Sequence, residues 1–210
     1  MNLSNYEKKI FITFIIPTLG RDSLIDAIDS LLALKDPDWN AVIIFDGVKN
    51  KFTINDSRIK IIESEKNGDK GVRNNAGAVR NIGLKYNHCS EWIGFLDDDD
   101  YLSSDYIDNL KEEISIHKNI EVCIFRMAYH NGHILPEKLD RNITKGKVGI
   151  SFAVKKEIAE KNFFINNDFE DYIYLKNLQS KKHKIVISSY VSYFIRCKPF
   201  KCVFFPKILL

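Results

Sequence analysis

Four consecutive aspartates, Asp97 to Asp100, follow a short apolar run, Ile93 to Leu96, near the middle of the 210-residue chain. Adjacent carboxylates repel one another and raise each other's pKa, so such a run is costly unless a cation lies beside it. Carboxylate oxygens suit Mg²⁺ or Mn²⁺, which proteins usually hold with one or two carboxylates plus substrate phosphates. We therefore interpret the run as a metal-binding segment. The alternative is a solvated acidic loop that precedes a helix beginning near Tyr106.

The apolar run is too short for a helix, which indicates a buried strand whose carboxyl end carries the acids. Two earlier apolar runs end in a similar way. Pro17 and Thr18 follow the strand predicted for Ile10–Ile16, and Asp46 and Gly47 follow the strand predicted for Ala41–Phe45. Ligands of open α/β sheets bind at the carboxyl ends of the strands. We therefore expect these three polar segments to line one edge of a sheet.

The first part of the chain alternates between strand and helix patterns. Besides the three strands above, it predicts helices from Asp22 to Leu32, from about Asn75 to Tyr86 and from Tyr106 to Ile116, and strands over Ile59–Ile62 and Val122–Met127. Such alternation is typical of one layered α/β domain in which helices flank a mixed, mostly parallel sheet.

The rest of the chain is less regular. Tyr129–Gly149 is polar and reads as loops over the sheet edge, where an acceptor could enter. After it the pattern predicts a strand over Ile150–Val154, a short helix over Lys156–Lys161, a helix opened by Asn166 to Asp171, and strands over Ile185–Ile187 and Val191–Ile195.

Composition excludes several classes of protein. The 31 basic and 28 acidic residues are scattered and give a net charge of only +3, which does not favour a nucleic-acid-binding protein. No run is long and apolar enough for a transmembrane segment. The start of the chain lacks the pattern of a signal peptide. The four cysteines form no CxxC pair. We expect a cytoplasmic protein. The tail Lys198–Leu210 either packs on its own domain or makes peripheral contact with a membrane.

Five segments in this order resemble the family-2 glycosyltransferases of the GT-A fold: Phe14–Thr18, Asp46-Gly47, Gly77–Gly83, Phe95–Asp100 and Glu170-Asp171. A single acidic motif would be weak support, whereas the ordered set is specific and spans nearly the whole chain. The resemblance implies one GT-A domain over residues 1–210, with a nucleotide-binding half, 1–128, and an acceptor-binding half, 129–210. It implies transfer of a sugar from a nucleotide donor, most simply UDP-linked, to a hydroxyl of a glycan, lipid or protein.

The departing diphosphate of such a donor gains negative charge, which a metal ion or cationic side chains must stabilise. By the resemblance, Asp99 is the direct ligand of Mn²⁺ or Mg²⁺, with Asp97 beside it. Asp97 or Asp98 reaches the ribose. Because four aspartates are consecutive, each of these roles could fall one residue earlier or later. The remaining donor-binding residues implied by the resemblance are Pro17, Thr18, Arg21, Asp46 and Arg80. The alternative for Arg80 is a surface arginine on a helix.

Transfer to a hydroxyl also requires a base that removes the acceptor's proton. By the resemblance this base is Asp171, with Glu170 positioning the acceptor, and a base opposite the leaving group implies inversion at the anomeric carbon. The alternative is that both acids only favour the first turn of a helix. Family members often add a histidine ligand near the end of the module, and Tyr190–Arg196 contains none.

Three other functions remain to be weighed. A sugar nucleotidyltransferase also uses clustered acids with Mg²⁺ but needs a glycine-rich, lysine-bearing loop, of which Pro17–Arg21 is a poor version. A haloacid-type phosphatase carries its acids after the first strand, not the fourth. A non-catalytic nucleotide-sugar-binding module would not need Glu170 and Asp171, and both are present.

Overall fold

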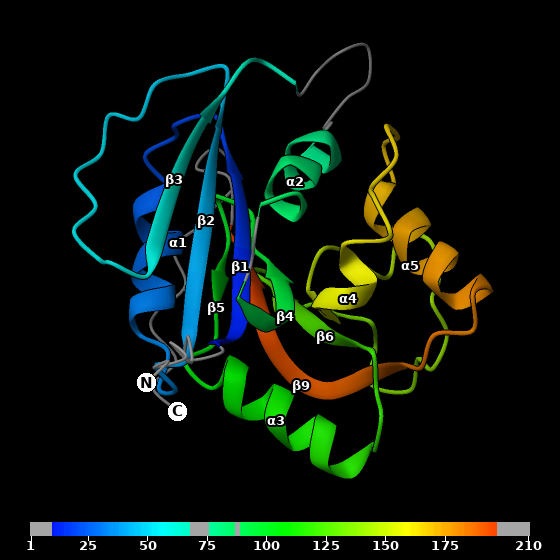
Figure 1. Ribbon diagram of the computed structural model, residues 1–210. Helices are drawn as coiled ribbons and strands as arrows, with labels where there is room; N and C mark the ends of the chain where they lie inside the picture. The colour runs from blue at the N-terminus through cyan, green and yellow to red at the C-terminus, as the bar shows by residue number, and fades with distance from the viewer. Residues whose placement is uncertain (1–9, 68–75, 87–88, 197–210) are drawn as a thin grey trace, which may run out of the picture.

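The computed structural model describes residues 10–67, 76–86 and 89–196 (Figure 1). The tail from residue 197, which contains the predicted membrane-contacting segment, and the predicted start of the second helix at Asn75 lie outside the described residues. Within the described part, no helix is long and apolar enough to cross a membrane.

The N-terminal strands form a parallel sheet in the order β3-β2-β1-β4. The apolar runs of β1, β2 and β4 are buried, as parallel strands with helices on both faces require, whereas the edge strand β3 has no buried residue. The bounds are β1 Ile10–Thr18, β2 Trp39–Asp46, β3 Ile59–Ser64 and β4 Ser90–Phe95. Thr18 pairs in register with Phe45, so the polar residues after β1 and β2 emerge side by side. The four predicted strands are confirmed, and each is longer than predicted.

The sheet continues from β4 with antiparallel and parallel neighbours in the order β8-β6-β9-β5, and β7 pairs with β6. The bounds are β5 Tyr101–Leu102, β6 Val122–Tyr129, β7 Ile134–Leu135, β8 Phe152–Lys155 and β9 Ile185–Ile195. The expectation of a single α/β domain with a mixed, mostly parallel sheet is confirmed, because the long pairings are parallel. The prediction of two strands near the end was wrong: β9 is continuous through Ser188 and Ser189.

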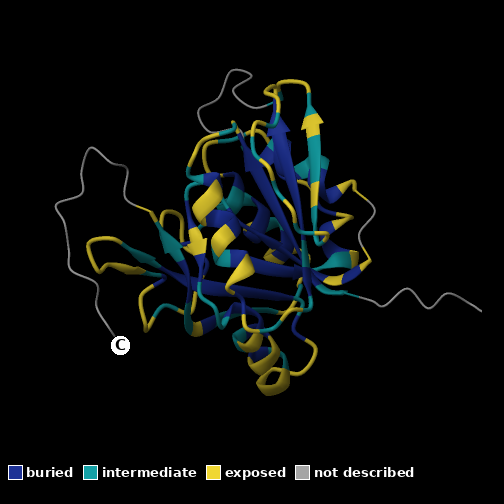
Figure 2. Ribbon diagram, turned by 90° about the vertical axis from the view of Figure 1, so that its left-hand side faces the viewer, coloured by how far each residue is buried: buried dark blue, intermediate teal, exposed yellow. Residues whose placement is uncertain are grey.

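Helices cover both faces of the sheet. Figure 1 shows α1 on one side of strands β1–β3 and α2 on the other, with α3 at the foot of the molecule. The bounds are α1 Leu24–Leu32, α2 Ala76–Leu84, α3 Tyr106–Ile116, α4 Lys156–Ala159 and α5 Glu170–Ser180. Figure 2 shows that burial is concentrated in the strands and that the exposed residues lie on outer helix faces and loops.

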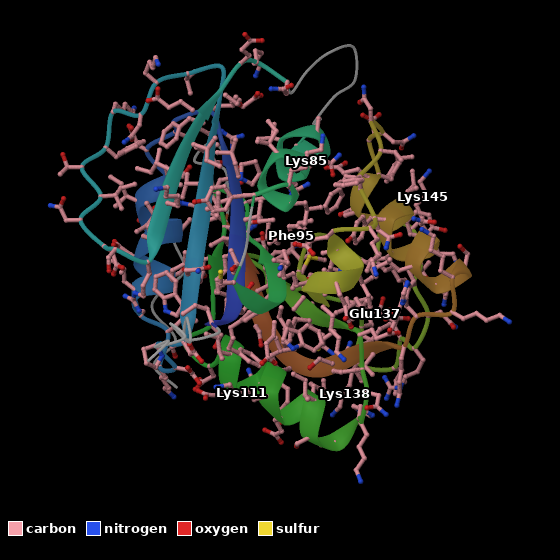
Figure 3. All side chains as sticks on the ribbon, viewed as in Figure 1. Lys85, Phe95, Lys111, Glu137, Lys138 and Lys145 are labelled. Atoms are coloured by element: carbon pink, nitrogen blue, oxygen red, sulfur yellow. The ribbon has the colours of Figure 1, made fainter. Side chains whose placement is uncertain are left out.

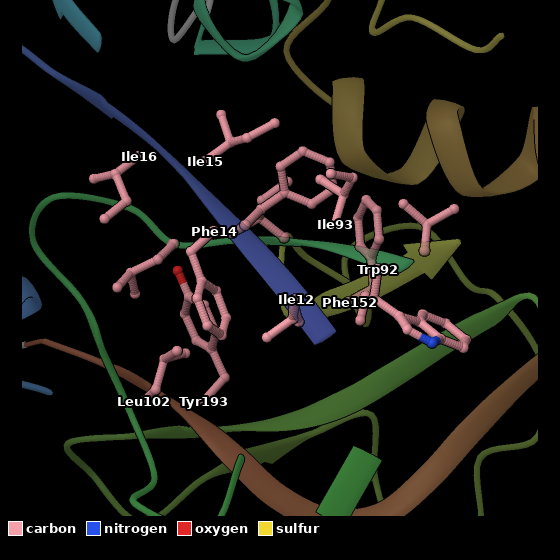
Figure 4. Close-up of a cluster of buried hydrophobic side chains, with 14 of the residues drawn as sticks. Ile12, Phe14, Ile15, Ile16, Trp92, Ile93, Leu102, Phe152 and Tyr193 are labelled. Carbon is pink, nitrogen blue, oxygen red and sulfur yellow. The ribbon is translucent and has the colours of Figure 1, made fainter. Parts of the chain in front are cut away.

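The core is continuous from β1 to β9, and aromatic side chains fill its centre. Figure 4 shows Phe14 and Ile12 of β1 beside Trp92, Phe152 and Tyr193, all of which are at most 3% exposed. Helix α2 packs against β1 unusually closely, because a Cβ built on Gly83 would lie 2.5 Å from Cγ2 of Ile15. This contact fixes α2 on the sheet next to the carboxyl ends of the strands.

Candidate active site

The three polar segments at the carboxyl ends of β1, β2 and β4 meet at one edge of the sheet, as predicted. They line a cleft of about 530 Å³. All ten predicted site residues line this cleft: Pro17, Thr18, Arg21, Asp46, Arg80, Asp97, Asp98, Asp99, Glu170 and Asp171. The two acids at the start of α5 therefore lie in the same cleft as the residues at the strand ends, although they follow the end of the aspartate run by 70 positions in the sequence.

Asp98 faces the loop after β1. The Thr18 hydroxyl donates a 2.6 Å hydrogen bond to Oδ2 of Asp98, and the Gly20 backbone N–H donates to the Thr18 hydroxyl oxygen at 2.9 Å. Burial raises the pKa of Asp98, while the Thr18 hydrogen bond and the positive charge of Arg21 oppose that rise. Asp98 thus joins two loops at the base of the cleft, and it does not belong to the group of acids described next.

Asp97, Asp99 and Asp100 form the acidic group of the cleft. One carboxylate oxygen from each lies within 4.8 Å of the other two. Asp100 is 7% exposed; burial and then the negative charge of Asp97 raise its pKa to about 8. The alternative of a solvated acidic loop was wrong, because Asp98 and Asp100 are both buried.

Residues at the end of β9 and just after it form hydrogen bonds with the aspartate run. The Asp97 backbone N–H donates to the Tyr193 hydroxyl oxygen at 3.1 Å, and the Arg196 backbone N–H donates to Asp100 at 2.9 Å. Tyr193 is fully buried. The end of β9 therefore fixes both the first and the last aspartate of the run.

Arg80 lies inside the protein between two parts of the site. One nitrogen of its guanidinium group donates to Asp97 at 2.5 Å and the other donates to Glu170 at 3.0 Å. The side chain is 3% exposed, so the alternative of a surface arginine was wrong. Two carboxylates keep the pKa of Arg80 above its ordinary value despite its burial, which acts the other way. Arg80 thus joins the acidic group to the first residue of α5.

Two further contacts tie α2 to the segment before α5. The Asn81 side chain donates to the Phe164 carbonyl and accepts from the Phe164 backbone N–H, both at 2.8 Å. A Cβ built on Gly77 would lie 2.8 Å from Cβ of Phe164 and 3.0 Å from Cγ of Glu170. A glycine at position 77 is therefore what permits α2 to approach this segment.

Glu170 and Asp171 form the first turn of α5, where the helix dipole favours acids. Both acids also face the cleft. Burial raises the pKa of Asp171, and the Tyr172 backbone N–H and Arg80 oppose that rise. Burial likewise raises the pKa of Glu170, against the charge of Arg80. The backbone at Gly149 approaches Asp171 closely, since a Cβ built there would lie 3.5 Å from Oδ2.

Asp46 and Arg21 lie at the other end of the cleft. Asp46 is 2% exposed and accepts a 2.5 Å hydrogen bond from the Asn67 backbone N–H, and the Lys66 ammonium lies 3.3 Å from its other oxygen. Arg21 is half exposed and pairs with Asp99 at 2.7 Å. Asp46 therefore reaches the cleft from the end of β2, and Arg21 reaches it from the loop after β1.

The sequence analysis missed several residues of the cleft. Asp100 is part of the aspartate run, but the resemblance assigned it no role. Lys66 and Asp168 also line the cleft, as does Tyr129 at the end of β6. Asp168 stands two residues before Glu170, and its position could have suggested it. Nothing in the sequence marks Tyr193 or Lys66.

The fold of this chain is similar to that of several solved structures. The solved structure of S. aureus TarS 1-349 superposes with a TM-score of 0.70 at 17% identity, covering 89% of this chain and 60% of that one. Its complex with UDP gives a TM-score of 0.69 at 17% identity, over 90% of this chain and 61% of that one. Its complex with UDP-GlcNAc gives a TM-score of 0.64 at 16% identity, covering 90% of this chain and 59% of that one.

At these identities the superpositions show the shared fold alone, and this chain spans about 60% of the length of TarS 1-349. Comparison with curated proteins gave no sequence match. The profile described as Glycosyl transferase family 2 matches residues 13–204. That match takes in β1, the aspartate run and the acids of α5, so the chain belongs to glycosyl transferase family 2.

Proposed function

We propose that the protein transfers a sugar from a nucleoside-diphosphate donor, UDP-linked, to a hydroxyl of a glycan, lipid or protein acceptor, with inversion at the anomeric carbon. The observation that carries the proposal is the joining, through Arg80, of the acidic group to the acid pair of α5 within one cleft. The UDP and UDP-GlcNAc complexes of TarS support the choice of a uridine donor.

In this proposal residues 1–128 bind the donor and residues 129–210 bind the acceptor. Asp46 accepts a hydrogen bond from the base or ribose at one end of the cleft. Pro17 and Thr18 form the loop beneath the nucleotide, and Asp98 keeps that loop in place through its 2.6 Å hydrogen bond with Thr18. Arg21 reaches over the acidic group from the exposed side, where it can approach the diphosphate.

The charge of the cleft suits a divalent cation. Among the described residues, eight carboxylates line it against three cationic side chains, Arg21, Lys66 and Arg80. A diphosphate would add further negative charge, which this balance cannot accept without a cation. Asp97, Asp99 and Asp100 present oxygen ligands close enough together to hold Mn²⁺ or Mg²⁺. When bound, the metal ion supplies charge stabilisation for the departing diphosphate.

Asp171 serves as the base in this proposal. A carboxylate whose pKa is raised by burial accepts a proton more readily than an exposed aspartate, provided that it is ionised when the acceptor arrives. Arg80 helps to keep it ionised. Glu170 is held by Arg80 and positions the acceptor hydroxyl beside Asp171. Attack from the Asp171 side, opposite the leaving diphosphate, would produce inversion.

The test is to incubate the protein with UDP-sugars and Mn²⁺ and to measure UDP release, with and without candidate acceptors. Asp99→Ala should abolish metal-dependent donor binding. Asp171→Asn should leave donor binding intact and lower turnover by a factor of about 10² or more, the usual contribution of general base catalysis. Full activity of Asp171→Asn, or retained stereochemistry of the product by NMR, would remove Asp171 from this role.

The same assay separates the alternatives. Release of pyrophosphate from UTP and a sugar phosphate would indicate a nucleotidyltransferase, and binding of UDP-sugar without turnover would indicate a non-catalytic module. The loop from Pro17 to Arg21 disfavours the first alternative, since its only cationic side chain, Arg21, pairs with Asp99 and Asp98. The acid pair at the start of α5 disfavours the second.

A further inference from the structure

The loop that joins α4 to α5 carries three exposed apolar side chains. Phe163 is 43% exposed, Ile165 is 50% exposed and Phe169 is 40% exposed. They alternate with residues that face the protein, because Asn162 and Phe164 are at most 5% exposed. Single exposed apolar residues are ordinary, but three within seven positions of one loop indicate a contact surface.

This loop is held firmly, so its exposed apolar residues are displayed by a fixed backbone. Phe164 stacks on Tyr174 with ring centroids 4.3 Å apart and meets Phe95 edge-on at 5.2 Å. Asn81 makes the two hydrogen bonds with the Phe164 backbone described above. Because Phe164 is anchored in the core, Phe163 and Ile165 cannot withdraw into it without breaking these contacts.

Lysines surround the same loop. The Lys85 ammonium lies 5.8 Å from the centroid of the Phe163 ring, and the Lys145 ammonium lies 3.8 Å from that of the Phe169 ring. Figure 3 labels both lysines, Lys85 near α2 and Lys145 near α5. Lys161 at its start is also exposed. Within the described residues neither Lys85 nor Lys145 forms an ion pair; both are exposed, and each ammonium lies near an aromatic ring of the loop.

The loop and the residue before it also carry two exposed acids, Glu160 and Asp168. Glu160 pairs with Lys156 at 3.3 Å, and Asp168 lines the cleft. The surface made of Phe163, Ile165, Phe169, Lys85, Lys145 and Lys161 is therefore apolar and cationic, and we call it the loop surface. Apolar side chains that project from a loop among lysines match the boundary of an anionic bilayer, where the former enter the headgroup region and the latter pair with phosphates.

We propose that the loop surface docks the protein on an anionic phospholipid membrane, and that the acceptor is a hydroxyl carried by a lipid-linked molecule in that membrane. The second part rests on the proposed function. Phe169 directly precedes Glu170 and Asp171, and Lys145 directly precedes Gly146, which lines the cleft. Docking through these residues brings the Asp171 end of the cleft to the lipid surface and leaves the Asp46 end free for a nucleotide donor from solution.

The test measures binding of the full chain to vesicles of phosphatidylcholine alone and of phosphatidylcholine mixed with phosphatidylglycerol. Wild-type protein should bind the anionic vesicles more tightly. Phe163→Ser/Ile165→Ser should weaken that binding by about tenfold or more, since two apolar side chains no longer enter the bilayer. Lys85→Gln/Lys145→Gln should weaken it by about 10- to 30-fold, because each lysine near an anionic surface contributes about a fivefold gain.

The matched control is Ile116→Ser/Lys118→Gln at the end of α3, which Figure 1 places at the foot of the molecule, away from the loop. This variant loses one exposed apolar residue and one lysine and should bind like the wild type. The proposal is wrong if the Phe163/Ile165 variant binds as tightly as the wild type, or if both kinds of vesicle bind equally well. A change of oligomeric state in the loop variants would point to a protein interface instead.

Activity distinguishes failure of this proposal from failure of the proposed function. The Phe163/Ile165 variant should retain wild-type release of UDP in solution, because neither side chain lines the cleft. Loss of transfer only with acceptors embedded in vesicles supports the membrane-bound acceptor. If vesicle binding follows the prediction but no UDP-sugar is turned over, membrane docking through the loop surface is supported and the proposed transferase activity is wrong.

Discussion

Arg80 is the buried group whose replacement should most change stability. Its side chain is 3% exposed and pairs with Glu170, which is 10% exposed, and with Asp97, which is 34% exposed. Arg80→Met leaves Glu170 buried without its cation, and breaking such a buried pair costs about 3–5 kcal/mol. The pair with Asp97 is partly screened by solvent and should add only about 0–1 kcal/mol. We therefore expect Arg80→Met to lower the free energy of unfolding by about 3–5 kcal/mol.

Variants of Glu170 and Asp97 show how much each ion pair of Arg80 contributes to the free energy of unfolding. Glu170→Gln should cost more than Asp97→Asn, because Glu170 is the more deeply buried partner. The double variant Arg80→Met/Glu170→Gln should lose less than the two single losses together. Removal of both charges leaves no buried ion alone, and couplings between contacting residues are typically about 0.5–3 kcal/mol.

The assay is urea unfolding followed by circular dichroism, with thermal midpoints as a second measurement. For a chain of this length a loss of 3–5 kcal/mol corresponds to a fall of about 6–20 °C in the midpoint. Arg21→Met is the matched control. Arg21 pairs with an aspartate of the same cleft but is 49% exposed, so its loss should stay within about 1 kcal/mol. An equal cost for the two variants, or a stable Arg80→Met protein, would refute the buried link between Asp97 and Glu170.

Three further predictions concern the acidic group and the close contacts around it. In the folded protein Asp100 keeps its proton up to about pH 8, whereas an unfolded aspartate releases its proton near pH 4. Without metal, the free energy of unfolding should therefore fall as pH rises between these values. Thermal midpoints from pH 5 to 8.5 should show this fall, and Asp100→Asn should flatten it. Added Mn²⁺ should raise the midpoint more at pH 8 than at pH 6, since a metal needs ionised ligands; an equal rise would argue against Asp100 as a ligand. Gly83→Ala should lower the free energy of unfolding by about 1–3 kcal/mol despite the better helix propensity of alanine, because its Cβ would meet Ile15, and an unchanged midpoint would contradict that close packing.

Hydrophobic patterning made most of the sheet predictable. Strands β1, β2 and β4 each contain a largely apolar run, and each run ends in residues typical of a strand end. The same reasoning divided β9 in two, because Ser188 and Ser189 interrupt its apolar pattern. Ser188 is fully buried within the strand. Its burial depends on packing against distant segments, which local sequence does not report.

The sequence predicted which residues would line the cleft, but it did not predict their contacts. Motif order identified all ten predicted residues of the cleft, because the resemblance supplies types and positions. It did not show that Arg80 would be enclosed between Asp97 and Glu170, or that Asp98 would hold Thr18. Such pairings depend on the packing of α2 against both the sheet and α5, and no local pattern encodes that geometry.

The contacts of α2 limit how this chain could be recombined with its relatives. Gly77, Arg80 and Asn81 each contact Phe164 or Glu170. The short helix α2 therefore fits a segment that lies eighty or more positions downstream. A chimera that imports a foreign sequence after residue 128 to gain a new acceptor would separate these pairs. Grafting would therefore succeed only when residues 76–84 travel with the imported part, so the unit of exchange is discontinuous in the gene although it is contiguous in space.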